Sequence, residues 1–170
     1  MKKQLFLVSI FLFVSAIAVH AQDNASNASA DDELQNRAQS VYFEILGPGV
    51  LYSFNYDSRF QNTPDGLGGR IGVSLIVADG SSLFTLPAMV NYLLGNDGKY
   101  FEMGLGATYL NIQEDETLFD ENPSVIGTMV FGYRSQPVDG GFMFRAGFSP
   151  IISEGNFIPY YPYLSLGYTF

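Results

Sequence analysis

The chain has 170 residues and a formal net charge of −9, which suggests one acidic domain. It contains no cysteine, and its single histidine is His20. These counts exclude disulfide cross-links, and they exclude Ser–His, Cys–His and histidine–metal chemistry from everything after residue 20. The acidic balance argues against nucleic acid as a partner, because phosphate binding needs basic patches. We therefore expect no catalytic residues, no metal ligands and no cofactor.

Residues 1–21 have the composition of a secretory signal peptide. Two lysines precede an apolar run from Leu5 to Val19, and Val19 and Ala21 are small residues at the −3 and −1 positions of a cleavage site. The apolar run has about 15 residues, whereas a helix that spans a membrane needs roughly 20. We therefore predict cleavage after residue 21 rather than an N-terminal membrane anchor.

Residues 22–39 are rich in Asn, Ala, Ser and Asp and have no apolar periodicity, so we predict a disordered linker. The pattern changes in residues 40–170, where apolar and polar residues alternate with a period of two. Such alternation is typical of β-strands with one buried face. The alternating segments are 41–46, 50–60, 67–77, 83–94, 99–111, 125–134, 141–152 and 160–170.

The number of strands depends on the stretch Gly47-Pro48-Gly49. If these residues form a hairpin turn, the chain has eight strands. If residues 41–60 form one bent strand, it has seven. Bacterial single-chain barrels have even numbers of strands, so we predict eight. The connections QPVDGG at 136–141 and SEGNFIP at 153–159 are expected to be a turn and a loop.

The lengths and compositions of the strands indicate which face is buried. Most of the predicted strands have about 10 to 12 residues, whereas 5 or 6 is usual in soluble sheets and roughly 9 to 11 cross a bilayer. The polar face is rich in glycine and carries charged residues in mid-strand. Membrane barrels place small and polar residues inside and an apolar band outside. We predict an all-β fold: an antiparallel, up-and-down transmembrane β-barrel of eight strands over residues 40–170.

The alternation places a group of charged side chains in the predicted lumen. They are Asp57, Arg59, Arg70, Glu102, Arg134 and Arg145. Glu44 joins them if the first strand is in register. The interior of an eight-stranded barrel is about filled by side chains, and buried charges must pair or cost several kcal/mol. We favour a static network that fixes the register; the alternative is a gate whose pairs rearrange to admit a small solute.

The final strand carries apolar residues at steps of two, and its last residue is aromatic. These residues are Leu164, Leu166, Tyr168 and Phe170. The pattern resembles the C-terminal recognition signal of bacterial outer-membrane proteins. That resemblance implies two partners, the barrel-insertion machinery and the lipid of the outer membrane.

The whole region 40–170 resembles small outer-membrane β-barrel proteins of the Bacteroidetes type. The stretches that carry the resemblance are VYFEILGPGVLYSFNYDSRF, TLPAMVNYLLG, YFEMGLGATYL and GFMFRAGFSP. The architecture is also similar to the small OmpA, OmpX and OmpW barrels. The resemblance implies an integral protein of a Gram-negative outer membrane. We expect no periplasmic peptidoglycan-binding domain, because residues 22–39 are too few to form one. The resemblance implies a place and a fold rather than an activity.

The predicted loop 113–123 is strongly acidic. Its acidic residues are Glu114, Asp115, Glu116, Asp120 and Glu121. Carboxylates can bind Ca²⁺ or Mg²⁺ through oxygen ligands, but this loop lacks the spacing of a known calcium loop. We favour a solvated loop; a divalent-cation bridge to anionic lipid headgroups is the lesser alternative.

Three functions fit the sequence. The first is a non-enzymatic outer-membrane barrel with a structural or surface-interaction role. The second is a narrow channel or transporter for small or hydrophobic solutes, which conductance across a bilayer would distinguish from the first. The third is a soluble periplasmic binding barrel of the lipocalin type, which would stay in solution without detergent.

Overall fold

The computed structural model describes residues 38–78, 81–113, 124–153 and 155–170. The predicted signal peptide, most of the predicted linker 22–39 and the acidic residues of loop 113–123 lie outside this part of the chain. No helix within the described residues is long and apolar enough to cross a membrane.

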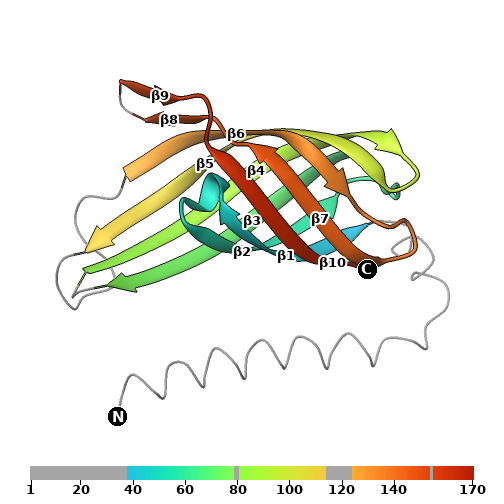
Figure 1. Ribbon diagram of the computed structural model, residues 1–170, viewed down its shortest axis with the longest axis horizontal. Coiled ribbons are helices and arrows are strands. Elements are labelled where there is room, and N and C mark those ends of the chain that lie inside the picture. The colour runs from blue at the N-terminus through green and yellow to red at the C-terminus, as the bar shows by residue number, and fades with distance from the viewer. Residues whose placement is uncertain (1–37, 79–80, 114–123, 154) are drawn as a thin grey trace, which may run out of the picture. The chain divides into compact units, whose positions relative to one another are not determined.

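Eight long strands form a closed antiparallel barrel (Figure 1). They are β1 (Gln39–Leu46), β2 (Tyr52–Arg59), β3 (Gly66–Ala78), β4 (Ser81–Asn96), β5 (Lys99–Gln113), β6 (Ser124–Ser135), β7 (Gly141–Phe148) and β10 (Pro162–Thr169). A 3₁₀ turn, η1 (Gly47–Gly49), separates β1 from β2. The prediction of an all-β barrel with eight strands is therefore confirmed, and the Gly-Pro-Gly stretch is a hairpin turn.

The first and last strands meet and close the ring. β1 and β10 pair from Ser40 opposite Thr169 to Leu46 opposite Tyr163. Beyond that ladder, the Gln39 amide donates to the Phe170 carbonyl at 3.1 Å, and the Phe170 amide donates to the Gln39 carbonyl at 2.9 Å. Residues 163–169 of the last strand thus pair with both β1 and β7, and Gln39 already belongs to the sheet. We call this end of the barrel, where Gln39 meets Phe170, the terminal end, and the opposite end the distal end.

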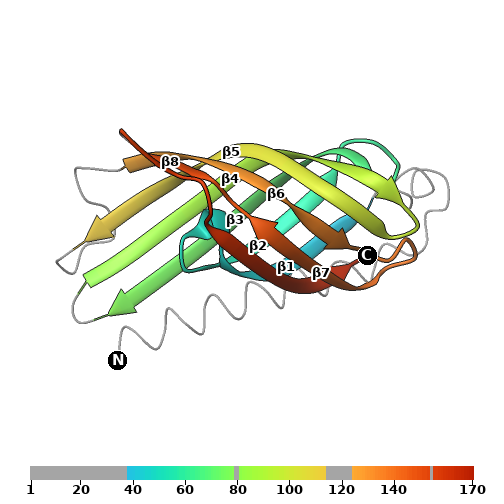
Figure 2. The same cartoon turned by 45° about the horizontal axis from the view of Figure 1, so that its top comes forward.

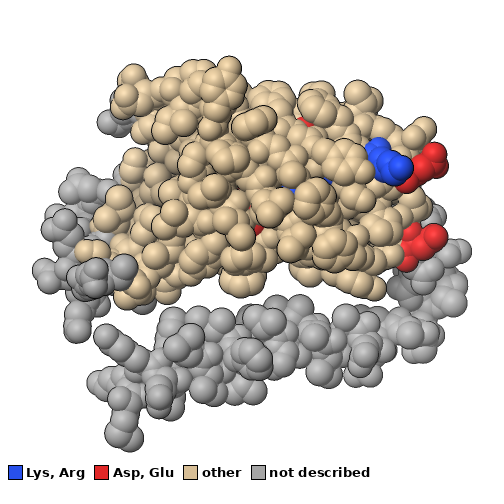
Figure 3. All heavy atoms as spheres, in the orientation of Figure 1, with Lys and Arg blue, Asp and Glu red and all other residues tan. Residues whose placement is uncertain are grey.

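The two faces of the wall differ sharply in chemistry. Outward side chains are large and apolar, and many are half exposed or more, such as Ile71 at 51%, Leu105 at 63% and Phe142 at 64%. Most inward side chains are polar or charged, and Glu102 and Arg145 are completely buried. On the face of the barrel seen in Figure 3, only small spots of charged atoms show between the side chains of the wall, and the larger charged groups lie at the terminal end.

The wall has unequal height. β1, β2, β7 and β10 have 8 residues each, whereas β3, β4 and β5 have 13, 16 and 15. The long strands continue past the short ones at the distal end (Figures 1 and 2). One side of the barrel therefore rises well above the other.

The connection between β7 and β10 differs from the prediction. Residues 141–152 do not form one strand, because β7 ends at Phe148 and Pro150 has no amide hydrogen to continue the ladder. The chain then forms a short hairpin, β8 (Ile151–Ser153) and β9 (Asn156–Ile158), in the segment 153–159 that was expected to be a loop. β8 pairs with β6 at Gly127, so this hairpin extends the tall side of the wall.

Glycines on the inward face let neighbouring strands cross closely. A Cβ atom on Gly106 of β5 would lie 2.2 Å from the carbonyl oxygen of Ala88 in β4, which is backbone and cannot move aside. Gly127 of β6 faces the other way, and its nearest neighbour would be a side-chain atom of Ile152 at 3.5 Å. The two positions therefore differ in whether the wall can accept a side chain.

We expect Gly106→Ala to destabilise the barrel by about 1–3 kcal/mol, because the added methyl group overpacks the β4–β5 contact. Gly127→Ala is the matched control and should change the stability by less than about 0.5 kcal/mol. Urea titration in detergent micelles, followed by the heat-modifiable migration of folded barrels on gels, measures both. Equal stabilities for the two variants would contradict this account of the close strand crossing.

Candidate functional site: the filled lumen

The structure places all seven charged side chains of the predicted lumen inside the barrel, at most 3% exposed. They are Glu44 of β1, Asp57 and Arg59 of β2, Arg70 of β3, Glu102 of β5, Arg134 of β6 and Arg145 of β7. Six of the eight wall strands thus contribute a charge. The alternation along each strand explains their direction, because residues two apart share a face.

Arg145 binds two carboxylates. Its Nε and Nη2 atoms donate to the two oxygens of Glu102, each at 2.7 Å, in the bidentate geometry that makes the strongest pairs. Its Nη1 atom donates to Glu44 at 3.0 Å. The other oxygen of Glu44 accepts a hydrogen bond from Arg70. These four residues join strands β1, β3, β5 and β7 across the lumen.

Asp57 lies between the other two arginines. One of its carboxylate oxygens accepts from Arg59 at 2.5 Å and from Arg134 at 3.1 Å. The Asn91 amide donates to the second oxygen of Asp57 at 2.7 Å and to Glu102 at 2.9 Å. Asn91 of β4 therefore joins the two groups into one network.

Sequence reasoning missed two kinds of residue in this network. Asn91 is a buried, inward residue of β4, but a single amide has no motif or charge that marks it in the sequence. Tyr42 and Tyr163 flank Arg145, whose guanidinium carbon lies 4.5 Å and 5.2 Å from their ring centroids. Such contacts between a cation and an aromatic face are stabilising.

The β1–β2 turn folds into the lumen. All three residues of η1 are buried, and the turn contacts β3, β4, β5, β6 and β10. Thr108 donates to the Pro48 carbonyl at 2.8 Å, and Thr85 donates to the Gly49 carbonyl at 3.2 Å. The Tyr161 hydroxyl donates to the Val50 carbonyl. The turn therefore lies on the distal side of the ionic network and fills the lumen there.

The turn has a strained backbone. Leu46 and Val50 adopt positive φ angles of 60° and 74°, and the Leu51 amide bonds to the Gly49 carbonyl at 3.1 Å across Val50. This is a γ-turn with a β-branched residue at its centre, a rare and unfavourable conformation. Each such residue costs of the order of 1–3 kcal/mol. The hydrogen bonds to the surrounding strands hold the turn in place against this strain.

The turn also needs its glycines. Gly47 has a φ of 69°, and a Cβ atom there would lie 2.9 Å from a carboxylate oxygen of Glu44. A Cβ atom on Gly49 would lie 2.5 Å from the side chain of Ser53. A turn with larger residues at these positions would not fit inside the barrel.

Paired charges fill this part of the lumen. Each lumen carboxylate contacts two arginines, because Glu102 also lies 4.0 Å from Arg134. Within the described ranges, no three acidic, histidine or cysteine side chains gather as a metal site would require.

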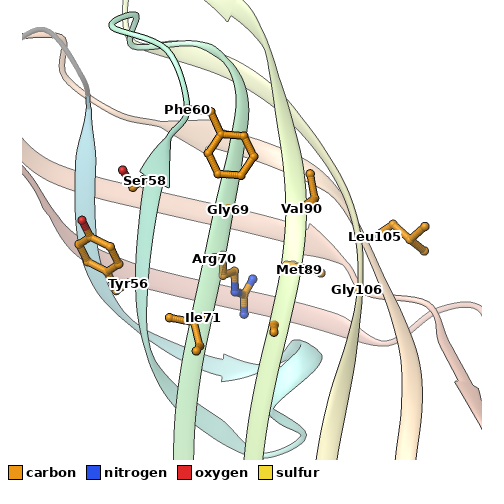
Figure 4. A pocket seen from close by; sticks show the side chains of 11 residues that line it. Tyr56, Ser58, Phe60, Gly69, Arg70, Ile71, Met89, Val90, Leu105 and Gly106 are labelled. Atoms are coloured by element: carbon orange, nitrogen blue, oxygen red, sulfur yellow. The ribbon is translucent and has the colours of Figure 1, made fainter. Parts of the chain in front are cut away.

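A groove of about 600 Å³ lies on the outer wall, over β2 to β5, where Gly69 and Ala88 leave a depression between Tyr56, Phe60 and Val90 (Figure 4).

The four residues of the predicted C-terminal signal share the outer face of the barrel. Leu164, Leu166, Tyr168 and Phe170 are all exposed. The first three alternate along β10 with the buried residues Tyr163, Ser165 and Thr169, and Phe170 follows directly at the terminal end. Their arrangement is that of an apolar stripe beside the β1–β10 closure.

No protein-family description matches the chain, and no curated protein matches it. Among solved structures, it is similar to the N-terminal β-barrel domain of OprF from Pseudomonas aeruginosa, with a TM-score of 0.58 and 13% identity over 80% of this chain and 98% of that domain. It is also similar to the Yersinia pestis outer membrane protein Ail, with a TM-score of 0.45 and 15% identity over 79% of this chain and 98% of Ail. The fold is that of an eight-stranded outer-membrane β-barrel.

We expect Arg145→Ala to destabilise the barrel by about 3–5 kcal/mol, because it takes one of the two arginine partners from each of the buried carboxylates Glu44 and Glu102. The double variant Arg145→Ala/Glu102→Gln should recover part of this loss, since it also removes one unpaired charge. Lys99→Ala, at an exposed position, is the control. Thermal unfolding in micelles measures all three, and an unchanged unfolding temperature for Arg145→Ala would contradict a paired interior.

Proposed function

We propose that this chain is an integral protein of the bacterial outer membrane with a structural or surface-interaction role and no catalytic activity. The observation that carries the proposal is the inverted distribution of side chains. A barrel in water would bury its large apolar residues, whereas this one exposes them around its wall and buries its charges. Hydrocarbon is the environment in which such a wall is stable.

Features of the sequence support the route to that location. The predicted signal peptide of residues 1–21 would export the chain, and the stripe that ends at Phe170 would present the last strand to the barrel-insertion machinery. The resemblance to small barrels of the Bacteroidetes type supports a Gram-negative source. The likeness to the OprF domain supports the same fold and leaves the role open.

Cell fractionation tests the location. We expect the protein in the outer-membrane fraction, with folded and heated samples migrating differently on a gel. Recovery of a monomer from the periplasm without detergent would contradict the proposal and favour the soluble, lipocalin-like alternative.

The interior favours a structural role over a conduit. The ionic network joins six strands, and the β1–β2 turn adds a second obstruction on its distal side. The competing proposal, a narrow channel, rests on the polar character of the same lumen. We expect the purified barrel to give no stepwise conductance in planar lipid bilayers at neutral pH. Reproducible single-channel steps would favour the channel.

The C-terminal stripe generates a prediction about assembly. We expect Phe170→Ala to lower the amount of folded barrel in the membrane several-fold, because it removes the terminal aromatic of the proposed recognition signal. Phe157→Ala is the matched control, since Phe157 in β9 is 61% exposed and Phe170 is 59% exposed. Heat-modifiable gels of membrane fractions measure the folded amount. Equal losses for the two variants would contradict a specific role for the last residue.

A further inference from the structure

Neutral hydroxyl groups lie inside the barrel on the distal side of the ionic network, and three of them bond to the β1–β2 turn. We call this group the hydroxyl collar. Its members are Ser74 of β3, Thr85 of β4, Thr108 of β5, Thr128 of β6, Ser149 after β7 and Tyr161 before β10. Ser74 lies directly opposite Thr85 in the β3–β4 ladder. Ser149 is joined to Tyr161, whose carbonyl accepts the Ser149 amide at 2.6 Å.

Only half of the collar is engaged by the turn. Thr85, Thr108 and Tyr161 donate to its carbonyl groups. The other hydroxyl groups are buried and have no hydrogen-bond partner in the described part of the chain. They belong to Ser74, Thr128 and Ser149. Buried polar groups are normally satisfied, so these three hydroxyl groups are available to a hydrogen-bonding partner that the turn does not supply.

The collar is chemically distinct from the ionic network. In β3 the collar residue Ser74 lies distal to Arg70, and in β5 Thr108 lies distal to Glu102. Ser149 likewise follows Arg145 toward the distal end. The collar itself therefore consists of neutral donors and acceptors, and its hydroxyl groups offer a charged solute no ionic partner in exchange for lost hydration.

We propose that the hydroxyl collar is a binding site for an uncharged solute whose carbonyl, ether or hydroxyl oxygens accept hydrogen bonds, and that the β1–β2 turn occupies this site as a displaceable internal substitute. The carbonyl groups of Pro48, Gly49 and Val50 take the places that the oxygens of the solute would take. Displacement relieves the strain at Leu46 and Val50. This inference goes beyond the proposed role. It does not require a conducting lumen, because the ionic network would still block the barrel after the turn has left the collar.

The absence of cysteine in the chain allows a direct test of access to the collar. Ser74→Cys places one thiol in the collar, and the probe is the neutral reagent methyl methanethiosulfonate applied to the barrel in lipid nanodiscs. Adding Gly49→Val should expel the turn, because its Cβ atom would lie 2.5 Å from Ser53. We expect the thiol of Ser74→Cys/Gly49→Val to be modified about tenfold faster than the thiol of Ser74→Cys alone. Adding Val50→Gly to Ser74→Cys should instead slow the modification, because glycine accepts the positive φ without strain and the turn stays in place.

The control for these variants is Gly127→Val, another glycine replaced by valine, at a position with ordinary neighbours. It should leave the modification rate unchanged. If Gly49→Val does not fold, Thr85→Val/Thr108→Val removes two of the bonds that hold the turn and should raise the rate in the same direction. Equal rates of thiol modification with the native turn and with the altered turn would overturn the proposal that the turn can leave the collar.

Binding is tested on the opened barrel with tetraethylene glycol, an uncharged chain of ether oxygens. It should protect the thiol of Ser74→Cys/Gly49→Val, slowing modification by about threefold in a saturable manner, whereas succinate at equal concentration should not. Absence of protection by tetraethylene glycol, or equal protection by succinate, would overturn the assignment of the collar as a site for uncharged solutes. These outcomes are measured separately from cell fractionation, so failure of this proposal is distinguishable from failure of the proposed location.

Discussion

The pairing of buried arginines with buried carboxylates is the interaction on which the interior of this barrel depends. Arg145 connects Glu44 on one strand with Glu102 on another, and Asp57 gathers two further arginines. A carboxylate removed from water needs such partners, so each charge specifies where the facing strands must lie. The network therefore holds the strands together from the inside, as close apolar packing does in a soluble domain. Its ion pairs are also directional, so they fix the register of the strands.

The apolar core, by contrast, is small. Its buried cluster consists of Met89, Val130 and Tyr163, whereas the larger apolar side chains stand on the outer wall. Such a protein gains little from hiding apolar surface inside itself. Its stability has two sources of different kinds, the hydrogen-bonded ring of strands with its ionic filling, and the environment that covers the wall. This division explains why most strand glycines face inward, where space is short, and most of the large rings face outward.

Alternation in the sequence was sufficient to predict the fold and the direction of most side chains, because a period of two assigns each residue to one face. The prediction that Glu44 faces the lumen stayed conditional, because the first strand is short and its register depends on β10. The inward course of Gly47-Pro48-Gly49 was beyond such reasoning, because the same letters suit a turn on either side of the rim. The β8–β9 hairpin was missed because alternation continues through Ser149 and Pro150, where the hydrogen-bonding partner changes. Pairing between distant segments is a tertiary property that local periodicity does not report.

The unequal wall has a mechanical consequence for any bilayer around it. Eight residues of strand cover about 26 Å along their own path, and less along the barrel axis because strands tilt. A typical hydrocarbon core is about 30 Å thick. Lipids beside β1, β2, β7 and β10 would have to compress or tilt, whereas those beside β4 would not. Hydrophobic mismatch of this kind costs fractions of a kcal/mol per ångström. Such a cost is enough to tilt the barrel in one preferred direction and to favour different lipids beside its short strands and beside its long strands.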